Sequence, residues 1–282
     1  MTIILILIFI ALSLFLFIGN KNTRSVVINY IDIDCEKGSK KSEEPLRILR
    51  ISDMHLENIS ISPEQLYEKL KMQPIELIAL TGDFMDKERS IPKLLPYLQV
   101  LNKLKPVYGI YAVFGNHDYV LRKDDLNQLK NVLVNNGIRI LQNENDRIDI
   151  DGVPLNIIGI DDFSTKRSNL MESYNGLDKG YNLIITHDPN VVLSMHDYHF
   201  DYLLSGHFHG GQIHWPKPYH LVKMGKLVKM NMVKGLHSYE EKRFYISEGL
   251  GQTGVNIRIG SRPEITVHNV HLPHSIDVIK AG

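Results

Sequence analysis

The stretch LLSGHFHGGQIHWP, residues 203–216, points to the fold because it joins an apolar run to two histidines, His207 and His209, one residue apart. The apolar residues are typical of a buried strand, and the glycines around the histidines let the backbone turn sharply. A His-x-His pair alone also occurs in ordinary loops. Whether this pair is functional therefore depends on partners elsewhere in the chain.

Four more apolar runs end in polar residues of the same kinds. These residues are Asp53 and His55 in SDMHL, Asp83 in TGDFMD, Asn116 and His117 in FGNHD, and His187 in ITHDP. Taken singly, each has an ordinary explanation as a surface turn, a helix N-cap or a core histidine. Ligands of α/β proteins bind beyond the carboxyl ends of strands. Five strands that deliver Asp, His and Asn to one edge therefore predict a metal site.

The hydrophobic pattern predicts an α/β fold. In the first half, expected strands alternate with expected helices at residues 62–73, 90–104 and 123–137, which implies some parallel strands. The second half reads as a hairpin over 146–162, turning at Asp151 and Gly152, followed by short strands. Two sheets stacked face to face, with helices outside, is the simplest arrangement that buries all these segments.

Composition excludes several classes of protein. The 282 residues are enough for a well-buried core, and the 43% hydrophobic and 23% charged residues are ordinary globular values. The 32 basic and 32 acidic side chains give no net charge, which argues against a nucleic-acid binder. Cys35 is the single cysteine, so an internal disulfide and a cysteine-based zinc site are excluded.

The N-terminus has the pattern of a membrane anchor. Residues 2–19 are uncharged and apolar, and 18 residues at 1.5 Å each give about 27 Å, close to the thickness of a hydrocarbon core. No basic residue precedes the run and no small-residue cleavage site follows it, so an uncleaved anchor is favoured over a signal peptide or a core helix. Lys21 and Arg24 then favour a cytoplasmic location for the residues that follow the anchor.

These patterns divide the chain into three parts. Residues 1–20 form the anchor, residues 21–45 hold an edge strand at 25–34 and a polar linker, and residues 46–282 form the domain that carries the predicted metal site.

The five motifs, in this order, resemble the calcineurin-like metallophosphoesterase superfamily over about residues 46–270. They are DMH (53–55), GDFMD (82–86), GNHD (115–118), His187 and GHFH (206–209). The continuations GHFHGGQIHWP and EGLGQTGVNIRIGSRPEI (248–265) resemble the branch of small bacterial phosphoesterases that are often membrane-associated. The resemblance implies a four-layer α-β-β-α sandwich with mixed sheets.

The resemblance also implies two divalent metal ions that share one aspartate. One ion would take Asp53, His55, Asp83 and His209, and the other would take Asp83, Asn116, His187 and His207. Carboxylate, imidazole and amide groups suit Mn²⁺, Fe or Zn²⁺. His117 would bind the substrate phosphate and protonate the leaving group, and Asp118 would orient His117 and keep it protonated. Asp86 would hold a ligand in place, or would simply be an acid at a helix start.

Other residues have weaker assignments. His214 is a candidate substrate contact, and Arg258 and Arg262 are candidates for binding a second phosphate, with plain surface charge as the alternative. The remaining histidines match no motif and are expected mostly at the surface or in loops. The insert at residues 214–242, in which lysines alternate with Leu, Val and Met, would form a substrate lid, rest on the membrane, or be a solvated hairpin.

The resulting hypothesis is a membrane-anchored phosphohydrolase that uses two-metal-activated hydroxide. A phosphodiester or phosphoanhydride, on a lipid-linked or envelope substrate or on a phosphorylated small molecule, is preferred over a monoester. The alternatives are a phosphomonoesterase of the same fold, a catalytically silent scaffold and a DNA nuclease. Neutral charge and the apolar N-terminus disfavour the nuclease, and no nucleic-acid partner is expected.

Overall fold

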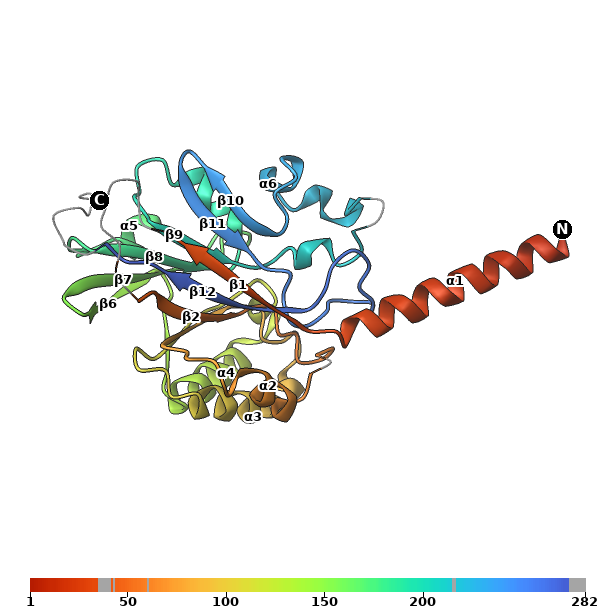
Figure 1. The fold of residues 1–282 in the computed structure, drawn as a ribbon, viewed down its shortest axis with the longest axis horizontal. Coiled ribbons are helices and arrows are strands. Elements are labelled where there is room, and N and C mark those ends of the chain that lie inside the picture. Colours follow the sequence, from red (N-terminus) through yellow and green to blue (C-terminus); the bar gives the residue numbers. More distant parts are fainter. Residues whose placement is uncertain (35–41, 43, 60, 215–216, 274–282) are drawn as a thin grey trace.

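The computed structural model describes residues 1–34, 42, 44–59, 61–214 and 217–273. In this part of the chain, two six-stranded sheets pack face to face (Figure 1). Cys35, most of the expected linker and His274 lie outside the described residues.

The first sheet is mostly parallel. Its order is β1 (Val27–Ile33), β12 (Glu264–Val270), β2 (Leu46–Ile51), β3 (Leu77–Thr81), β4 (Ile110–Val113) and β5 (Ile138–Ile140). Strands β2 to β5 run parallel, and β12 is antiparallel to β2. The edge strand expected at residues 25–34 is β1, which pairs in parallel with β12 along its whole length. The folded unit therefore includes residues that precede position 46.

The second sheet carries the hairpin that the sequence predicts. Its order is β10 (Gly235–Tyr239), β11 (Lys242–Ile246), β9 (Tyr202–Ser205), β8 (Tyr181–Thr186), β7 (Val153–Ile160) and β6 (Glu144–Ile150). Strands β6 and β7 are antiparallel, and the turn between them has φ of 52° at Asp151 and 85° at Gly152. Strands β7, β8, β9 and β11 are parallel, so their carboxyl ends lie at one edge.

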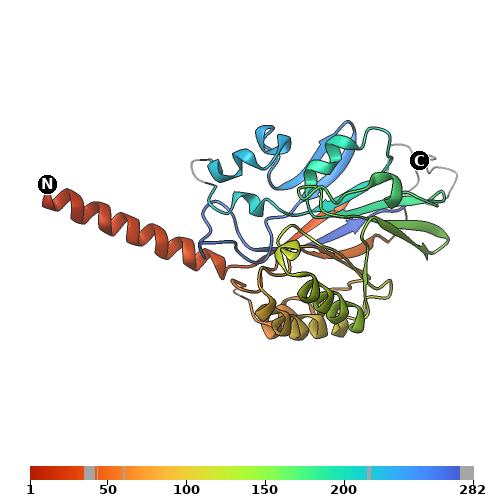
Figure 2. The same cartoon turned by 180° about the vertical axis from the view of Figure 1, so that it is seen from behind.

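Three helices cover the outer face of the first sheet (Figure 2): α2 (Pro63–Leu70), α3 (Ile91–Lys103) and α4 (Lys123–Asn135). Helix α2 begins where a capping box places it. The Ser62 hydroxyl accepts from the backbone N–H of Gln65, and the Gln65 side chain accepts from the backbone N–H of Ser62. It ends at Leu70, three residues before the expected boundary.

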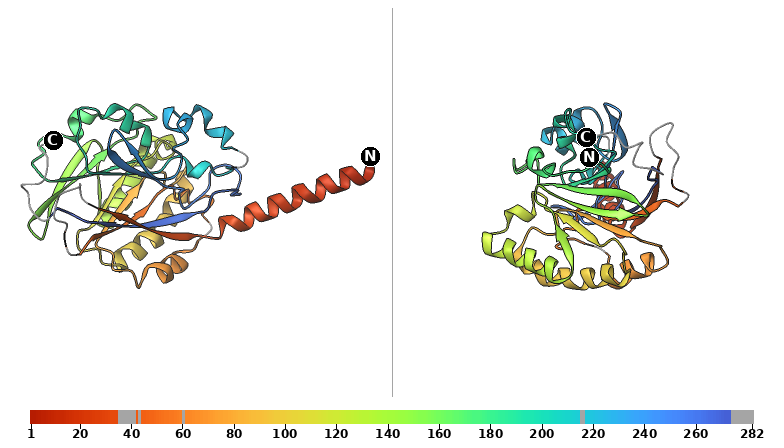
Figure 3. Two further views of the ribbon diagram at one scale, coloured as in Figure 1. Left: turned by 45° about the horizontal axis from the view of Figure 1, so that its top comes forward. Right: turned by 90° about the vertical axis from the view of Figure 1, so that its left-hand side faces the viewer.

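Short elements cover the second sheet, which completes the predicted four layers (Figure 3). They are α5 (Leu170–Ser173), η3 (Pro189–Ser194), η5 (Tyr219–Lys223) and α6 (Lys226–Lys229). Three further 3-10 turns are η1 (Glu88–Ser90), η2 (Asp118–Val120) and η4 (His209–Gly211). Buried side chains such as Leu77, Val113, Leu155 and Leu183 fill the space between the sheets. The four-layer prediction is thus confirmed.

Helix α1 (Thr2–Thr23) projects away from the sandwich (Figure 1). It is long and apolar enough to cross a membrane, and only 6% of its apolar window is buried, so it is not a core helix. Its last turn contacts a loop that precedes β12. The carbonyl of Gly19 accepts from Arg258 N at 2.9 Å, Asn20 donates to the carbonyl of Asn256 at 3.0 Å, and Asn22 donates to that of Arg258 at 2.9 Å.

Candidate metal centre

The strand ends bring the expected ligands together in two clusters. We call Asp53, His55 and His209 the first cluster, and Asp83, His187 and His207 the second cluster. Within each cluster, one ligand atom of every residue lies within 4.8 Å of the others. Asn116 follows β4, and its buried Oδ1 has no hydrogen-bond partner among the described residues. All seven expected ligand residues therefore lie at one edge of the stacked sheets.

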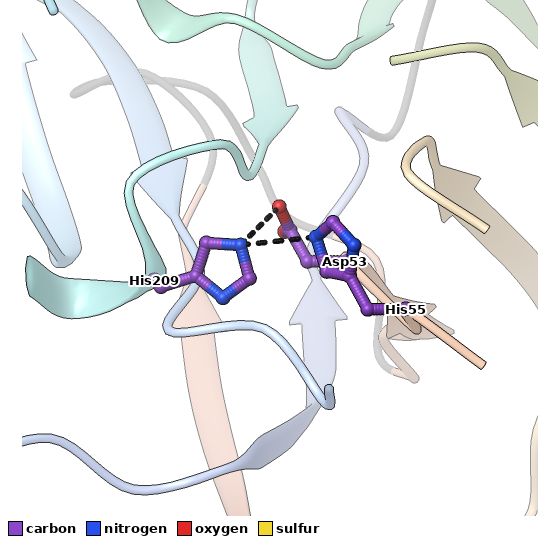
Figure 4. Close-up of side chains that lie close together, drawn as sticks. All are labelled: Asp53, His55 and His209. Atoms are coloured by element: carbon purple, nitrogen blue, oxygen red, sulfur yellow. Dashed lines mark hydrogen bonds and ion pairs between the residues drawn. The ribbon is translucent and has the colours of Figure 1, made fainter. Parts of the chain in front are cut away.

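In the first cluster, both neighbours of His209 face its Nε2 (Figure 4). This nitrogen lies 3.3 Å from Asp53 Oδ1 and 3.2 Å from His55 Nε2. Burial lowers the pKa of His209 to about 3, so its imidazole is neutral at physiological pH. The Asp53 carboxylate is held in turn by the Ser52 hydroxyl at 2.5 Å and by the backbone N–H of His207 at 3.1 Å.

In the second cluster, one carboxylate oxygen connects to both sets of ligands. Asp83 Oδ2 lies 3.1 Å from His187 Nε2 and 3.6 Å from His55 Nε2 of the first cluster. His187 Nε2 also lies 3.2 Å from His207 Nδ1. The position of Asp83 between the clusters is the one that a ligand shared by two ions requires.

Hydrogen bonds fix the tautomers of two histidines. His187 Nδ1 lies 2.8 Å from the carbonyl of Thr81, and His55 Nδ1 lies 3.1 Å from Asp86 Oδ1. Since a carbonyl and a carboxylate only accept, each Nδ1 carries a proton, and each Nε2 can present a lone pair to a metal ion. Metal-binding histidines use their second nitrogen in this way. The donor set therefore fits divalent cations.

Charge attraction within the clusters agrees with this fit. Burial disfavours a charged His187, yet the Asp83 carboxylate raises the pKa of His187 well above its usual value. Burial likewise disfavours ionised Asp83, but His187 and His55 hold its pKa far below the ordinary range. A carboxylate so placed is ionised at any working pH and attracts a positive charge, either that of the protonated His187 imidazole or that of a metal ion.

The ligands are held in an unusual backbone conformation. Five of them have positive φ: Asp53 (50°), His55 (38°), Asp83 (55°), His207 (76°) and His209 (51°). Residues other than glycine rarely adopt a positive φ, because the conformation is strained. Such strain persists only where the surrounding structure enforces it, and it is concentrated at functional sites.

Two glycines let neighbouring strands approach the carboxylates closely. A Cβ on Gly115 would lie 2.1 Å from Asp83 Oδ1, and a Cβ on Gly206 would lie 2.3 Å from Asp53 Oδ2. Neither distance is possible between real atoms. The glycines of the GNHD and GHFH motifs are therefore required by the packing around the ligands.

The side chain that contacts His117 is Asp86, which corrects the role expected for Asp118. Asp86 Oδ1 lies 3.0 Å from His117 Nδ1 and 3.1 Å from His55 Nδ1. Burial opposes a charged His117, but Asp86 and Asp83 raise the pKa of His117 to about 9. Asp86 therefore links the half-buried His117 to a ligand of the first cluster.

Asp118 instead organises the backbone beneath the centre. Its fully buried carboxylate accepts backbone N–H groups of Asp83 at 2.8 Å, Phe84 at 2.8 Å, Met85 at 3.3 Å and Gly115 at 2.9 Å. Burial and the Asp83 charge raise the pKa of Asp118 to about 7, while the backbone donors oppose this shift. Among the described residues, the hydrogen bonds of its side chain therefore go to backbone amides and not to His117.

A cavity of about 70 Å³ opens beside the ligands. It is lined by Asn116, His117, His207, Phe208, His209, Gln212, His220, Leu221, Met224 and Thr253. Leu221 and Met224 come from the insert at residues 214–242, which therefore reaches the centre. His220, which no motif marked, also lines this cavity.

The structure overturns one weaker assignment, that of Arg258, and places the other two residues, Arg262 and His214, outside the lining of this cavity. Arg258 is fully buried, and its guanidinium donates to backbone carbonyls such as that of Gly251 at 2.6 Å, so it is neither a phosphate ligand nor a surface charge. Arg262 lies at the base of α1, where it donates to the Ser25 hydroxyl at 2.7 Å. His214 is not among the lining residues, and its Nδ1 lies 2.8 Å from the carbonyl of Gly210.

Most other histidines lie at the surface or are half-buried, as expected, but His268 is not one of them. It is fully buried between the sheets, where Nδ1 lies 2.9 Å from the Tyr202 hydroxyl and Nε2 lies 2.8 Å from the Thr266 hydroxyl. Burial lowers the pKa of His268 well below its usual value, so it is a neutral core residue.

A family model described as calcineurin-like phosphoesterase matches residues 46–211, which is more than half of the chain. The chain belongs to the calcineurin-like phosphoesterase family. This confirms the resemblance, and it makes the protein a hydrolase that acts on phosphate esters.

Relatives match most of the chain. It is 62% identical over 269 residues to the metallophosphoesterase YkoQ of Bacillus subtilis (strain 168), covering 95% of this chain and 99% of YkoQ. It is 29% identical over 280 residues to the UDP-2,3-diacylglucosamine pyrophosphatase LpxG of Chlamydia muridarum (strain MoPn / Nigg), covering 79% and 82%. Phosphopantetheinyl hydrolase (PptH) from Mycobacterium tuberculosis superposes with a TM-score of 0.47 at 12% identity, covering 74% and 91%.

Proposed function

We propose that the protein is a two-metal phosphohydrolase that cleaves a phosphodiester or phosphoanhydride bond in a lipid-linked or envelope substrate. The observation that carries this proposal is the pair of clusters joined through Asp83, with His117 at the edge of the same cavity. Two divalent ions held there would supply the positive charge that activates a water nucleophile and stabilises the phosphoryl oxygens. One ion would be held by Asp53, His55, Asp83 and His209, and the other by Asp83, Asn116, His187 and His207.

His117 supplies the proton in this proposal. It lines the cavity, and Asp86 and Asp83 keep it protonated at neutral pH because they raise its pKa to about 9. A protonated imidazole binds a phosphate oxygen and then donates its proton to the leaving-group oxygen as the bond to phosphorus breaks. Asp86 positions the imidazole by accepting a hydrogen bond from His117 Nδ1, which leaves His117 Nε2 to donate the proton to the leaving group.

The lining of the cavity supports a substrate with an apolar part next to its phosphate. Besides the metal ligands, the apolar residues Phe208, Leu221 and Met224 line the cavity. The relative LpxG is named as a pyrophosphatase of a diacylated nucleotide sugar. Both observations favour a phosphoanhydride or diester that carries a lipid over a small phosphomonoester.

Helix α1 would hold the centre near such a substrate. We infer that it is an uncleaved anchor, because it is apolar, exposed and joined by hydrogen bonds to the catalytic domain. Lys21 and Arg24 follow the apolar run, and positive charges accumulate on the cytoplasmic side of membranes. We therefore propose that the catalytic domain lies in the cytoplasm.

The test uses the full-length chain in detergent, stripped of metal and then refilled separately with Mn²⁺, Fe²⁺ or Zn²⁺. Hydrolysis of a chromogenic phosphodiester, the matching monoester and a lipid-linked pyrophosphate is compared. Asp83→Asn should abolish turnover, and His117→Ala should reduce it about 100- to 10,000-fold, the usual contribution of a general acid. His196→Ala, which removes an exposed histidine bonded to Glu240, is the matched control and should keep full activity.

The substrates separate the remaining candidates. Metal-dependent cleavage of the diester or pyrophosphate supports the proposal. Turnover of the monoester alone would overturn the substrate class while keeping the metal centre. Two bound ions with no hydrolysis of any of the three compounds would favour the silent scaffold.

A further inference from the structure

An open groove lies where α1 meets the catalytic domain. It has a volume of about 690 Å³ and is lined by Phe17, Ile18, Asn20, Lys21, Asn22, Arg24, Ser25 and Arg262. We propose that this groove binds the phosphate headgroup of an anionic phospholipid. The proposal rests on α1 being a membrane anchor, as inferred above.

The charges of the groove favour an anion. Lys21 and Arg24 come from the end of α1, and Arg262 comes from the loop before β12, so three cations converge from segments far apart in the sequence. None of the described residues that line the groove is acidic. The hydrogen bond from Arg262 Nη1 to the Ser25 hydroxyl, at 2.7 Å, holds this guanidinium over the helix end. Its other N–H groups can form a fork for phosphate oxygens.

The depth of the groove matches that of a lipid headgroup. The apolar run at residues 2–19 spans about 27 Å, so the residues after it lie at the level of the headgroups. Phe17 and Ile18 are 68% and 52% exposed on the membrane side of the groove, next to the cations. An apolar wall beside a cationic wall fits the acyl chains and the phosphate of one lipid molecule. It does not fit a free phosphate ion, which has no apolar part.

A lipid bound here would act on the orientation of the metal centre. The loop that supplies Arg262 also contains Arg258, whose backbone N–H bonds to the carbonyl of Gly19 in α1. The Arg258 side chain bonds to carbonyls of Gly249 and Gly251 beside the first cluster. A headgroup held between Arg262 and the end of α1 would therefore fix the tilt of the catalytic domain against the bilayer.

The test measures which lipids the full-length protein retains. The protein is reconstituted in nanodiscs that contain phosphatidylcholine and phosphatidylglycerol, and native mass spectrometry counts the lipids that stay bound after release. We expect preferential retention of phosphatidylglycerol, at least a fivefold loss of that preference in Arg262→Gln, and complete loss in the triple variant that also carries Lys21→Gln and Arg24→Gln. Arg89→Gln, an exposed arginine in η1 outside the groove, is the matched control and should retain phosphatidylglycerol like the natural sequence.

Each other outcome overturns the proposal. Equal retention of phosphatidylglycerol by the natural sequence and the triple variant would show that the groove does not bind this lipid. Displacement of phosphatidylglycerol by inorganic phosphate would make it a site for the free ion. Failure of the protein to enter nanodiscs would remove the anchor as well. Metal-dependent hydrolysis by the natural sequence in detergent is assayed in parallel, so failure of lipid binding is distinguishable from failure of the proposed catalytic function.

Discussion

Asn in place of Asp118 distinguishes the role found in the structure from the role that the GNHD motif suggests. Each carboxylate oxygen of Asp118 accepts two backbone hydrogen bonds. Oδ2 accepts the N–H groups of Asp83 and Gly115, and Oδ1 accepts those of Phe84 and Met85. An asparagine amide keeps one accepting oxygen and turns an N–H₂ group toward the other two donors. Two buried backbone N–H groups lose their acceptors whichever way the amide is oriented.

The size of the effect follows from this count. An unsatisfied buried donor costs about 1–3 kcal/mol, so Asp118→Asn should lower the free energy of unfolding by about 2–6 kcal/mol. This is a large part of the roughly 5–15 kcal/mol that holds a typical domain together. The backbone of Asp83 is among the donors, so the occupancy of both metal sites should fall as well. Asp86→Asn is the comparison, because the Asp86 side chain is 34% exposed and its removal leaves these backbone bonds intact.

The assay is urea unfolding of the full-length protein in detergent, together with metal analysis of the purified variants. The expected result is a lower unfolding midpoint and less bound metal for Asp118→Asn, and near-natural stability for Asp86→Asn. The reasoning is refuted if Asp118→Asn unfolds like the natural sequence but changes the pH dependence of hydrolysis. That result would restore Asp118 as the partner of His117.

Three further predictions follow from the surroundings of the centre. Asp86→Asn removes a charge that raises the pKa of His117, and since only the protonated imidazole donates, the alkaline fall in hydrolysis should move to lower pH in a pH–rate profile. Gly206→Ala should reduce the metal content, measured by elemental analysis, because its Cβ would lie 2.0 Å from a serine hydroxyl and 2.3 Å from a ligand carboxylate. Gly137→Ala forces alanine into a positive φ of 76° and should lower the stability, but its Cβ meets no atom within 4 Å, so the metal content should be unchanged. Arg258→Met removes a donor from the buried carbonyl of Gly251 and from the part-buried carbonyl of Glu248, and should lower the unfolding free energy by about 1–6 kcal/mol in urea titrations; a change below 1 kcal/mol would contradict the assigned role.

The sequence predicts the layers and the ligand positions well because both depend on local pattern. Polar residues at the ends of apolar runs reach one edge once those runs pair in parallel, and this needs no knowledge of side-chain packing. The hairpin at Asp151 and Gly152 is predicted for the same reason, since these residue types favour positive φ.

Side-chain direction is what the sequence could not provide. Asp118 is adjacent to His117 in the chain but bonds to the amides of residues 83–85, whereas Asp86, 31 residues before His117, makes the contact. His220 reaches the cavity only because the insert folds back over the centre. The sequence alone does not show that Arg258 is buried. Its carbonyl partners surround the guanidinium only because of the folded conformation of the loop.

The ligands and the residues that support them form one energetic unit. A residue other than glycine at positive φ costs about 1–3 kcal/mol, and five ligands adopt that conformation. Their carboxylates and imidazole lone pairs also converge at distances near 3 Å, which is favourable only with a cation among them. The hydrogen bonds of Asp118 and Arg258 hold the backbone in this strained conformation, and bonds from the ligands to divalent ions would offset its cost. Metal binding and folding should therefore be coupled, so that a chelator lowers the unfolding midpoint of the whole domain rather than only removing its activity.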